Sequence, residues 1–198
     1  SGGMLLSSAP KVQGSFRFIR RLWKAVYDQV NAPPPADAIT ITEFNKTLLN
    51  AAQKDMRRLA HHTLEKVTDD IGRRRSFNTA VAAVMELLNA VSKFDSSSLY
   101  GRVVAHEALE IAVMCLSPMI PHVTHQLWRE LGHEQALATE RWWKPDPDAL
   151  VQDQIEISVQ VNGKMRARVS VAADADKDAA VKVALADANV QKLMEGKP

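Results

Sequence analysis

Cationic side chains gather at three places in this sequence, and phosphate binding is the chemistry that their spacing favours. One group has helical spacing near the N-terminus, one is a run of three arginines, and one alternates along a predicted strand. These candidate residues are Arg17, Arg20, Arg21 and Lys24; Arg73, Arg74 and Arg75; and Lys164, Arg166 and Arg168. Arg and Lys neutralise backbone phosphates and release counterions, so each group is a candidate nucleic-acid contact.

Each group also has a structural explanation. The cations of the first helix can simply form its solvated face. Arginines that follow a helix end stabilise the negative end of the helix dipole. Charged side chains on an exposed strand discourage edge-to-edge pairing. The sequence leaves both interpretations open for all three groups.

No pattern typical of an active site accompanies these cations. No glycine-rich phosphate loop follows a strand, and no nucleophile elbow is present. Asp69 and Asp70 lie beside the three arginines, where ion pairing explains them more simply than acid–base chemistry. His122, His125 and Cys115 do not have the spacing of a zinc site. We therefore predict no catalytic residue, no cofactor-binding residue and no metal ligand in this chain.

The composition is that of a folded intracellular protein. Of the 198 residues 46% are hydrophobic, which suffices for a core, and 25 Lys and Arg against 23 Asp and Glu leave a net charge of +2. A single cysteine fits a reducing cytoplasm, and no apolar run approaches the roughly 20 residues of a membrane helix. Residues 1–8 begin with Ser-Gly-Gly, which resembles an expression tag.

Hydrophobic periodicity predicts a helical bundle over residues 9–148. The first helix, from Ser15 to Val30, carries an apolar arc. That arc consists of Phe16, Phe18, Ile19, Leu22, Trp23, Val26, Tyr27 and Val30. A second helical stretch, capped by Thr42, runs toward Ile71, and its polar side carries Arg57, Arg58, His61 and Glu65. Gly72 suits the left-handed position past the helix end.

Three further helices complete the predicted bundle. Ser76 is the expected N-cap of a helix whose core stripe comprises Phe77, Val81, Val84, Leu88 and Val91. The helix that begins near Leu99 is apolar on most sides toward its end, which predicts a central position. A short helix over residues 123–131 should stop at Gly132.

Residues 149–198 predict a small α+β module. Ile155, Ile157, Val159 and Val161 alternate with polar residues, and Asn162-Gly163 supplies a two-residue hairpin turn. On the returning strand Met165, Ala167, Val169 and Val171 form the apolar face and the three cations form a ladder on the other. A helix over 176–193 follows. Because a hairpin and one helix bury little surface, we expect a further strand beyond Pro198, so that the module is truncated.

Several motifs resemble the C-terminal portion of bacterial leucyl-tRNA synthetase, a class I aminoacyl-tRNA synthetase, over essentially all residues after Ser8. The carriers are Phe18-Ile19-Arg20-Arg21-Leu22-Trp23, Val67-Thr68-Asp69-Asp70-Ile71-Gly72-Arg73-Arg74, Phe77-Asn78-Thr79-Ala80, Leu116-Ser117-Pro118-Met119-Ile120-Pro121-His122 and Val159-Gln160-Val161-Asn162-Gly163-Lys164. The middle motifs are shared more loosely with the valyl and isoleucyl enzymes. The spacing into the hairpin favours the leucyl enzyme.

This resemblance implies an anticodon-binding helical bundle that positions leucine tRNA without catalysing. The parent enzyme joins leucine to its tRNA with ATP and magnesium, and its catalytic and editing domains would be the other partners of this chain. The family's ATP-binding signatures, His-Ile-Gly-His and Lys-Met-Ser-Lys-Ser, do not occur here. We expect a monomer. The rival interpretation is a helical protein-interaction module whose arginines form internal ion pairs or dock on a partner domain.

Overall fold

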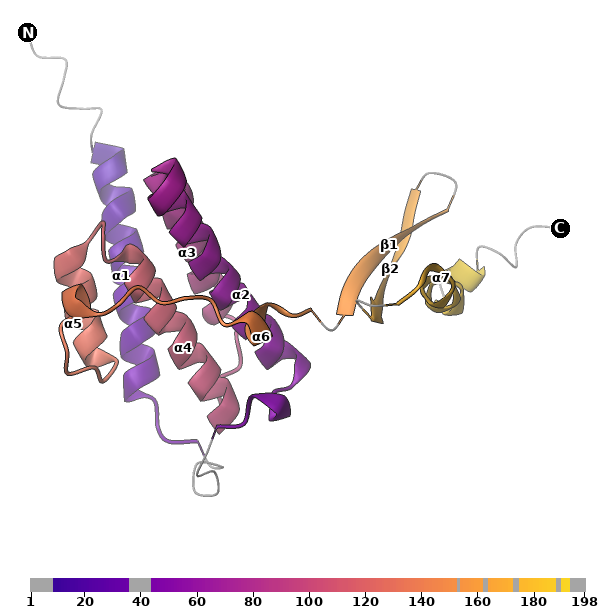
Figure 1. Ribbon diagram of the computed structural model, residues 1–198, viewed down its shortest axis with the longest axis horizontal. Coiled ribbons are helices and arrows are strands. Elements are labelled where there is room, and N and C mark those ends of the chain that lie inside the picture. Colours follow the sequence, from indigo (N-terminus) through magenta and orange to yellow (C-terminus); the bar gives the residue numbers. More distant parts are fainter. Residues whose placement is uncertain are drawn as a thin grey trace, which may run out of the picture. The chain divides into compact units, whose positions relative to one another are not determined.

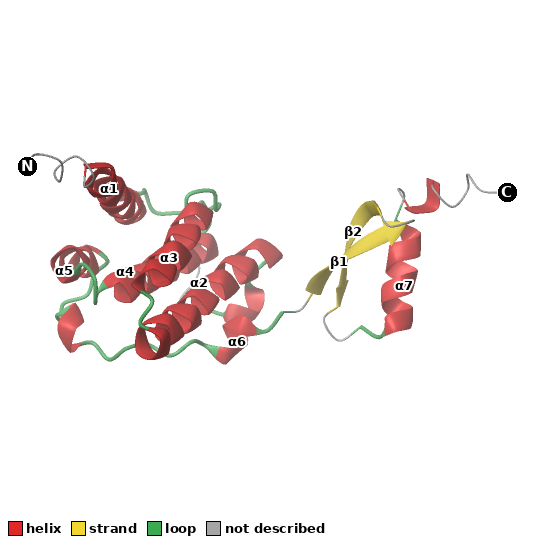
Figure 2. Ribbon diagram, turned by 90° about the horizontal axis from the view of Figure 1, so that it is seen from above, coloured by secondary structure: helices red, strands yellow, loops and turns green. Residues whose placement is uncertain are grey.

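The computed structural model describes residues 9–35, 44–152, 154–161, 164–172, 175–187 and 190–192. Its contacts divide the chain into two compact units, residues 1–150 and 151–198. The first unit is helical, and the second holds an antiparallel hairpin with a helix (Figure 1 and Figure 2). The predicted fold class, a helical bundle followed by a small α+β module with a β-hairpin, is confirmed. Residues 1–8, interpreted as a tag, lie outside the described residues.

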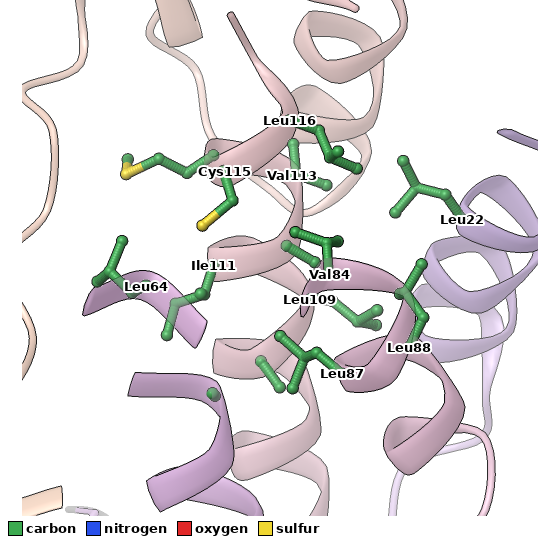
Figure 3. Packing of buried hydrophobic residues seen from close by; sticks show 14 of the residues in the cluster. Leu22, Leu64, Val84, Leu87, Leu88, Leu109, Ile111, Val113, Cys115 and Leu116 are labelled. Carbon is green, nitrogen blue, oxygen red and sulfur yellow. The ribbon is translucent and has the colours of Figure 1, made fainter. Parts of the chain in front are cut away.

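Helix α4 is the centre of the first unit. The described helices of this unit are α1 (Ala9–Asn31), α2 (Ala51–Asp69), α3 (Phe77–Val91), α4 (Leu99–Leu116), α5 (Pro121–Glu130) and α6 (Pro147–Leu150). Residues 111–116 of α4 are all buried, and α4 contacts α1, α2, α3 and α5. Figure 3 shows Ile111 beside Leu64 of α2, with Val84 and Leu88 of α3 nearby. The predicted central position of this helix is confirmed.

Helix α1 packs on the bundle through a narrower stripe than the sequence predicts. Leu22 and Val26 are fully buried, as their spacing requires. Trp23 and Tyr27, predicted on the same apolar arc, are 39% and 60% exposed. The prediction is wrong for these two rings because they lie at the margins of the arc, beyond the neighbouring helices that cover its centre.

The start of α2 is fixed by a capping box. Asn50 Oδ1 accepts a hydrogen bond from the Gln53 amide at 2.8 Å, and the Asn50 amide donates to Gln53 Oε1 at 3.0 Å. This reciprocal pair satisfies two amides that the first helical turn leaves unpaired. Thr42, the predicted cap, lies outside the described residues. A turn of 3₁₀ helix at Lys46–Leu48 precedes the cap.

The corner between α2 and α3 contains a π-helical turn, η2 (Asp70–Arg74). Arg75, not Gly72, adopts the left-handed conformation with φ 52°, so the prediction for Gly72 is wrong. The chain reverses here because the Ser76 amide donates to the Asp70 carbonyl at 2.8 Å. Ser76 precedes α3 as predicted, yet its side chain forms no capping hydrogen bond.

Phe77 is 48% exposed, which contradicts its predicted place in the core. It is the first residue of α3, and helical side chains lean toward the N-terminus, so its ring projects beyond the helix end. The buried line of α3 begins one turn later and includes Ala80, Val84 and Leu88. Ile71, the other residue predicted in the core at this corner, is partly buried against it.

A buried ionic cluster joins α2, α4 and the segment before α6. Arg57 is 4% exposed; its Nε donates to Glu107 Oε2 at 2.8 Å, and its Nη2 donates to Asp146 Oδ2 at 2.6 Å. Lys46 Nζ reaches the same Asp146 oxygen at 2.5 Å. His61 is 5% exposed. The polar side of α2 is therefore buried at Arg57 and His61, which the sequence did not indicate because their partners lie 46 to 89 residues away in sequence.

The contacts of His61 fix its tautomer. Its Nδ1 accepts a hydrogen bond from the Asp146 amide at 3.0 Å, so this nitrogen carries no proton. Its Nε2 lies 2.9 Å from Glu107 Oε1 and is therefore the protonated donor. A neutral imidazole thus holds the backbone of the segment before α6 against α2, while Arg57 holds the side chain of the same aspartate.

The charges of this cluster stabilise one another. Burial alone would raise the pKa of Glu107, but hydrogen bonds from His61 and Arg57 outweigh it and lower that pKa. Hydrogen bonds from Arg57 and then Lys46 hold the pKa of Asp146 well below its usual value. Burial works against the charged form of Arg57, yet Glu107 and Asp146 outweigh it and raise the Arg57 pKa.

The second unit pairs β1 (Gln154–Val161) with β2 (Lys164–Ala172), and α7 (Lys177–Ala186) packs on β2. The predicted turn at 162–163 lies outside the described residues. The Asp176 side chain caps α7 by accepting from the Ala179 amide at 2.8 Å. Val169, Val171 and Val190 are buried. The predicted helix over 176–193 is interrupted in the structure: α7 ends at Ala186, Asp187 is extended, and residues 190–192 are helical again.

Removal of Arg57 should destabilise the helical unit. Arg57→Ala leaves Glu107 and Asp146 short of their main cationic partner, and breaking a buried ion pair costs about 3 kcal/mol or more. Urea titration followed by tryptophan fluorescence measures this loss, because Trp23, Trp128, Trp142 and Trp143 all belong to this unit. The adjacent Arg58→Ala is the matched control, and its surface pair with Asp55 predicts a loss below about 1 kcal/mol. Equal losses would contradict the assignment.

Asp146 should make stability depend on acid. Its folded-state pKa is lowered from 3.8, so its contribution is fully present above about pH 4 and is lost as the pH falls through the folded value. Asp146→Asn should therefore be less stable than the unaltered chain at pH 7, and the difference should shrink below about pH 4. Urea midpoints at pH 7, 5, 4 and 3 test this. A difference that stays constant across these pH values would contradict it.

Candidate nucleic-acid interface

The four predicted cations of α1 share an exposed face of that helix. Arg17, Arg20, Arg21 and Lys24 are all exposed. Lys24 Nζ pairs with Asp28 at 2.5 Å, and Arg21 donates to the Asn89 side chain of α3. Within the described part of the chain, Arg17 and Arg20 form no ion pair. The face therefore keeps free positive charge after its internal pairs are made.

A cavity of about 440 Å³ lies beside this face, between α1, α3 and α4. Arg21 and Lys24 stand on its α1 side, and Leu88 and Leu109 contribute apolar lining. The positive charge is thus placed at one side of a largely apolar hollow. The cavity therefore combines charged and apolar lining.

The three arginines of the corner are exposed, and two of them share one acidic partner. Arg73 Nε pairs with Asp69 Oδ1, and Arg74 Nε pairs with Asp69 Oδ2 at 3.0 Å. Arg75 forms no ion pair among the described residues. Surface pairs of this kind contribute about 1 kcal/mol or less, so phosphates can compete for these guanidinium groups. The capping interpretation also keeps support, since the arginines close the end of α2.

The cations of the hairpin do not form the predicted ladder. The register pairs Arg168 with Ser158 and Ala167 with Val159, then shifts so that Met165 opposes Gln160. Arg166 is left as the extra residue of a bulge, and Lys164 opposes Val161. The backbone positions of Lys164 and Arg168 therefore fall on opposite faces of the hairpin.

The bulge changes the face on which Met165 lies but not that of Arg168. Arg168 is exposed, as predicted. Met165 is 56% exposed, although the sequence pattern placed it on the apolar face with Val169. One extra residue reverses every following side chain, because the pleat has a period of two.

His122, His125 and Cys115 are the residues whose spacing was compared with that of a zinc site. No group of three His, Cys, Asp or Glu side chains that could hold a metal ion occurs among the described residues. Cys115 is buried in α4, and burial raises the pKa of its thiol to about 12. His122 and His125 border a second cavity, of about 480 Å³, at the start of α5.

No described helix is long and apolar enough to cross a membrane.

The sequence interpretation missed one feature of the α1 face, its exposed aromatic rings. Trp23 precedes Lys24 directly, and Tyr27 follows it by three residues. Periodicity placed both rings on the apolar arc of the first helix, and neither ring was considered as a contact. The available signal was that Trp23 and Tyr27 adjoin cationic residues on the helix surface. Only residues at the margin of an apolar arc do so, and such residues are the ones most often exposed.

Comparison with known proteins places this arrangement in a family. Residues 53–183, more than half of the chain, match the model of the anticodon-binding domain of tRNA ligase. Curated relatives are the leucine–tRNA ligases of Nitrosococcus oceani (47% identical over 186 residues, 94% of this chain and 22% of the relative) and Thioalkalivibrio sulfidiphilus (50% over 188 residues, 94% and 22%). The chain spans about one fifth of the length of these relatives.

A solved structure has the same fold. The ternary complex of the Agrobacterium radiobacter K84 agnB2 LeuRS with tRNA and LeuAMS matches 96% of this chain and 24% of its own, at a TM-score of 0.69 and 22% identity. The similarity to bacterial leucyl-tRNA synthetases that the sequence motifs indicated is confirmed by the curated relatives. The chain belongs to the family of anticodon-binding domains of tRNA ligases.

Proposed function

We propose that this chain is the tRNA-binding C-terminal portion of a bacterial leucine–tRNA ligase. The observation that supports the proposal best is the 47–50% identity to leucine–tRNA ligases over 94% of the chain. These relatives favour the leucyl assignment over a valyl or isoleucyl one. The parent enzyme would join leucine to its tRNA with ATP and magnesium, and the chemistry would lie in the remainder of that longer protein.

The exposed cations suit a positioning role. Arginine and lysine contacts to phosphates fix the register and orientation of a folded RNA but do not read its sequence. The faces formed by Arg17 and Arg20 on α1 and by Arg73 to Arg75 at the corner present such groups to solvent. The proposed partners are leucine tRNA and the catalytic and editing domains of the same enzyme. We place this monomeric portion in the cytoplasm, where tRNA is charged.

One observation favours a second candidate, a protein-docking role for the corner. Arg73 and Arg74 both pair with Asp69, so part of their charge is already used inside the chain. A partner domain could be held by Arg75 and the exposed ring of Phe77. In this alternative the corner contributes to domain assembly, and RNA binding falls to α1 and the hairpin.

We expect salt-sensitive binding of leucine tRNA by the 198-residue chain. Replacement of Arg73, Arg74 and Arg75 by Gln should weaken binding at about 50 mM salt. It should also reduce the slope of log K against log salt by about one for each phosphate that the variant no longer neutralises. Fluorescence anisotropy with labelled tRNA across a salt series measures both quantities.

The matched control removes the same charge elsewhere. Arg129, Arg141 and Lys144 are exposed and lie outside the three predicted groups. Their replacement by Gln should leave the slope nearly unchanged. Equal effects of both triple variants would show that net charge, not the corner, governs binding. Absence of binding to any tRNA at about 50 mM salt would refute the proposal for this chain.

We also expect no leucine-dependent exchange of pyrophosphate into ATP by this chain. The family's ATP-binding signatures are missing from the sequence. The assay is run with the chain alone, and a full-length leucine–tRNA ligase serves as the positive control. Exchange above background that persists after further purification would contradict the assignment of a positioning role.

A further inference from the structure

Two large aromatic side chains of α1 are left in contact with solvent. Trp23 is 39% exposed and Tyr27 is 60% exposed, whereas Leu22 and Val26 on the same turns are fully buried. Residues four apart are neighbours on a helix surface, so the two rings lie one above the other along α1. Neither ring belongs to the described residues that pack against the hydrophobic core. The bundle therefore leaves most of the Tyr27 side chain and a substantial part of the Trp23 side chain uncovered.

Cations flank both rings at helical spacing. Arg20 precedes Trp23 by three residues, and Lys24 precedes Tyr27 by three, so each ring has a cation one turn away. Arg17 lies one turn before Arg20 and extends the row. Arg17 and Arg20 form no ion pair with any described residue, and Asp28, a carboxylate of the same helix, is paired with Lys24. This face of α1 therefore carries two exposed aromatic rings next to two arginines, Arg17 and Arg20, whose charge no described carboxylate neutralises.

We infer that Trp23 and Tyr27 stack on unpaired bases of the bound RNA while Arg17 and Arg20 hold the adjacent phosphates. Aromatic rings offer their faces to bases of any sequence, and interleaved cations follow the backbone that connects those bases. Charge complementarity favours a polyanion here, because an apolar protein surface would bury Arg17 and Arg20 without partners. The inference rests on the proposed tRNA binding and adds base contacts to its phosphate contacts.

The test separates stacking from charge. Trp23→Leu and Tyr27→Leu keep apolar bulk but remove the aromatic face, and each should weaken binding of leucine tRNA between about 5-fold and about 150-fold. The salt slope should stay unchanged in both variants because no charge is removed. Arg20→Gln should instead lower the slope by about one. Anisotropy titrations over a salt series give the affinity and the slope together.

Three controls exclude trivial causes. Tyr27→Phe keeps the ring and should bind as the unaltered chain does. Phe44→Leu alters a ring that is 38% exposed but lies against Tyr100 of α4, and should leave binding unchanged. The unfolding midpoint of Tyr27→Leu should match that of the unaltered chain, since Tyr27 is 60% exposed, and binding by Trp23→Leu is measured under conditions where its unfolding curve shows it fully folded. RNA binding should also quench tryptophan fluorescence, and Trp23→Leu should remove part of this quenching.

Distinct outcomes refute the inference and the proposed function. If the unaltered chain binds leucine tRNA and both leucine variants bind equally well, the stacking inference is wrong and the proposed function stands. If the unaltered chain binds no tRNA, both are wrong. If the variants keep tRNA affinity but no longer associate with the separately produced remainder of a leucine–tRNA ligase, the rings form a protein-docking face and the inference is overturned.

Discussion

The helical unit is organised around the last turns of α4, which other helices must shield from water on every side. Residues 111–116 are all buried, so no face of this segment can border on water. Leu22, Leu64 and Val84 each approach it from a different helix (Figure 3). Once α1, α2 and α3 surround α4 in this way, their outer faces are determined. The cations of α1 and of the α2–α3 corner are exposed because the opposite sides of their helices cover one segment.

The ionic cluster plays a different part from this apolar packing. Apolar burial is non-directional, but a guanidinium that serves two carboxylates and an imidazole with a fixed tautomer require one geometry. Arg57 and His61 therefore select which part of the later chain lies against α2. The selected part is the segment around Asp146, which leads from the last helices of the bundle to the hairpin. These polar contacts thus fix the position of the segment around Asp146, which the hydrophobic pattern of the sequence does not determine.

Periodicity predicted most of the fold because repeated spacing records which face of an element is buried. The central place of α4, the stop at Gly132 with φ 99° and the pairing of two strands all follow from local sequence. The errors share another cause, dependence on distant partners. Arg57 looks solvent-facing until Glu107 and Asp146 are brought to it, and Arg166 looks regular until the opposite strand shows a shifted register. The cations of the candidate interface were found from spacing, but the neighbouring rings of Trp23 and Tyr27 were not.

The attachment of Asp146 also bears on where this domain can be cut in protein engineering. A boundary drawn after α5 would look natural, because Gly132 closes the last long helix of the bundle. Such a truncation would remove Trp142 and Trp143, whose rings pack on the core, together with the aspartate that neutralises Arg57. The shortest autonomous version of the helical unit therefore extends to Leu150, and libraries of fusions or circular permutants should place their junctions beyond it.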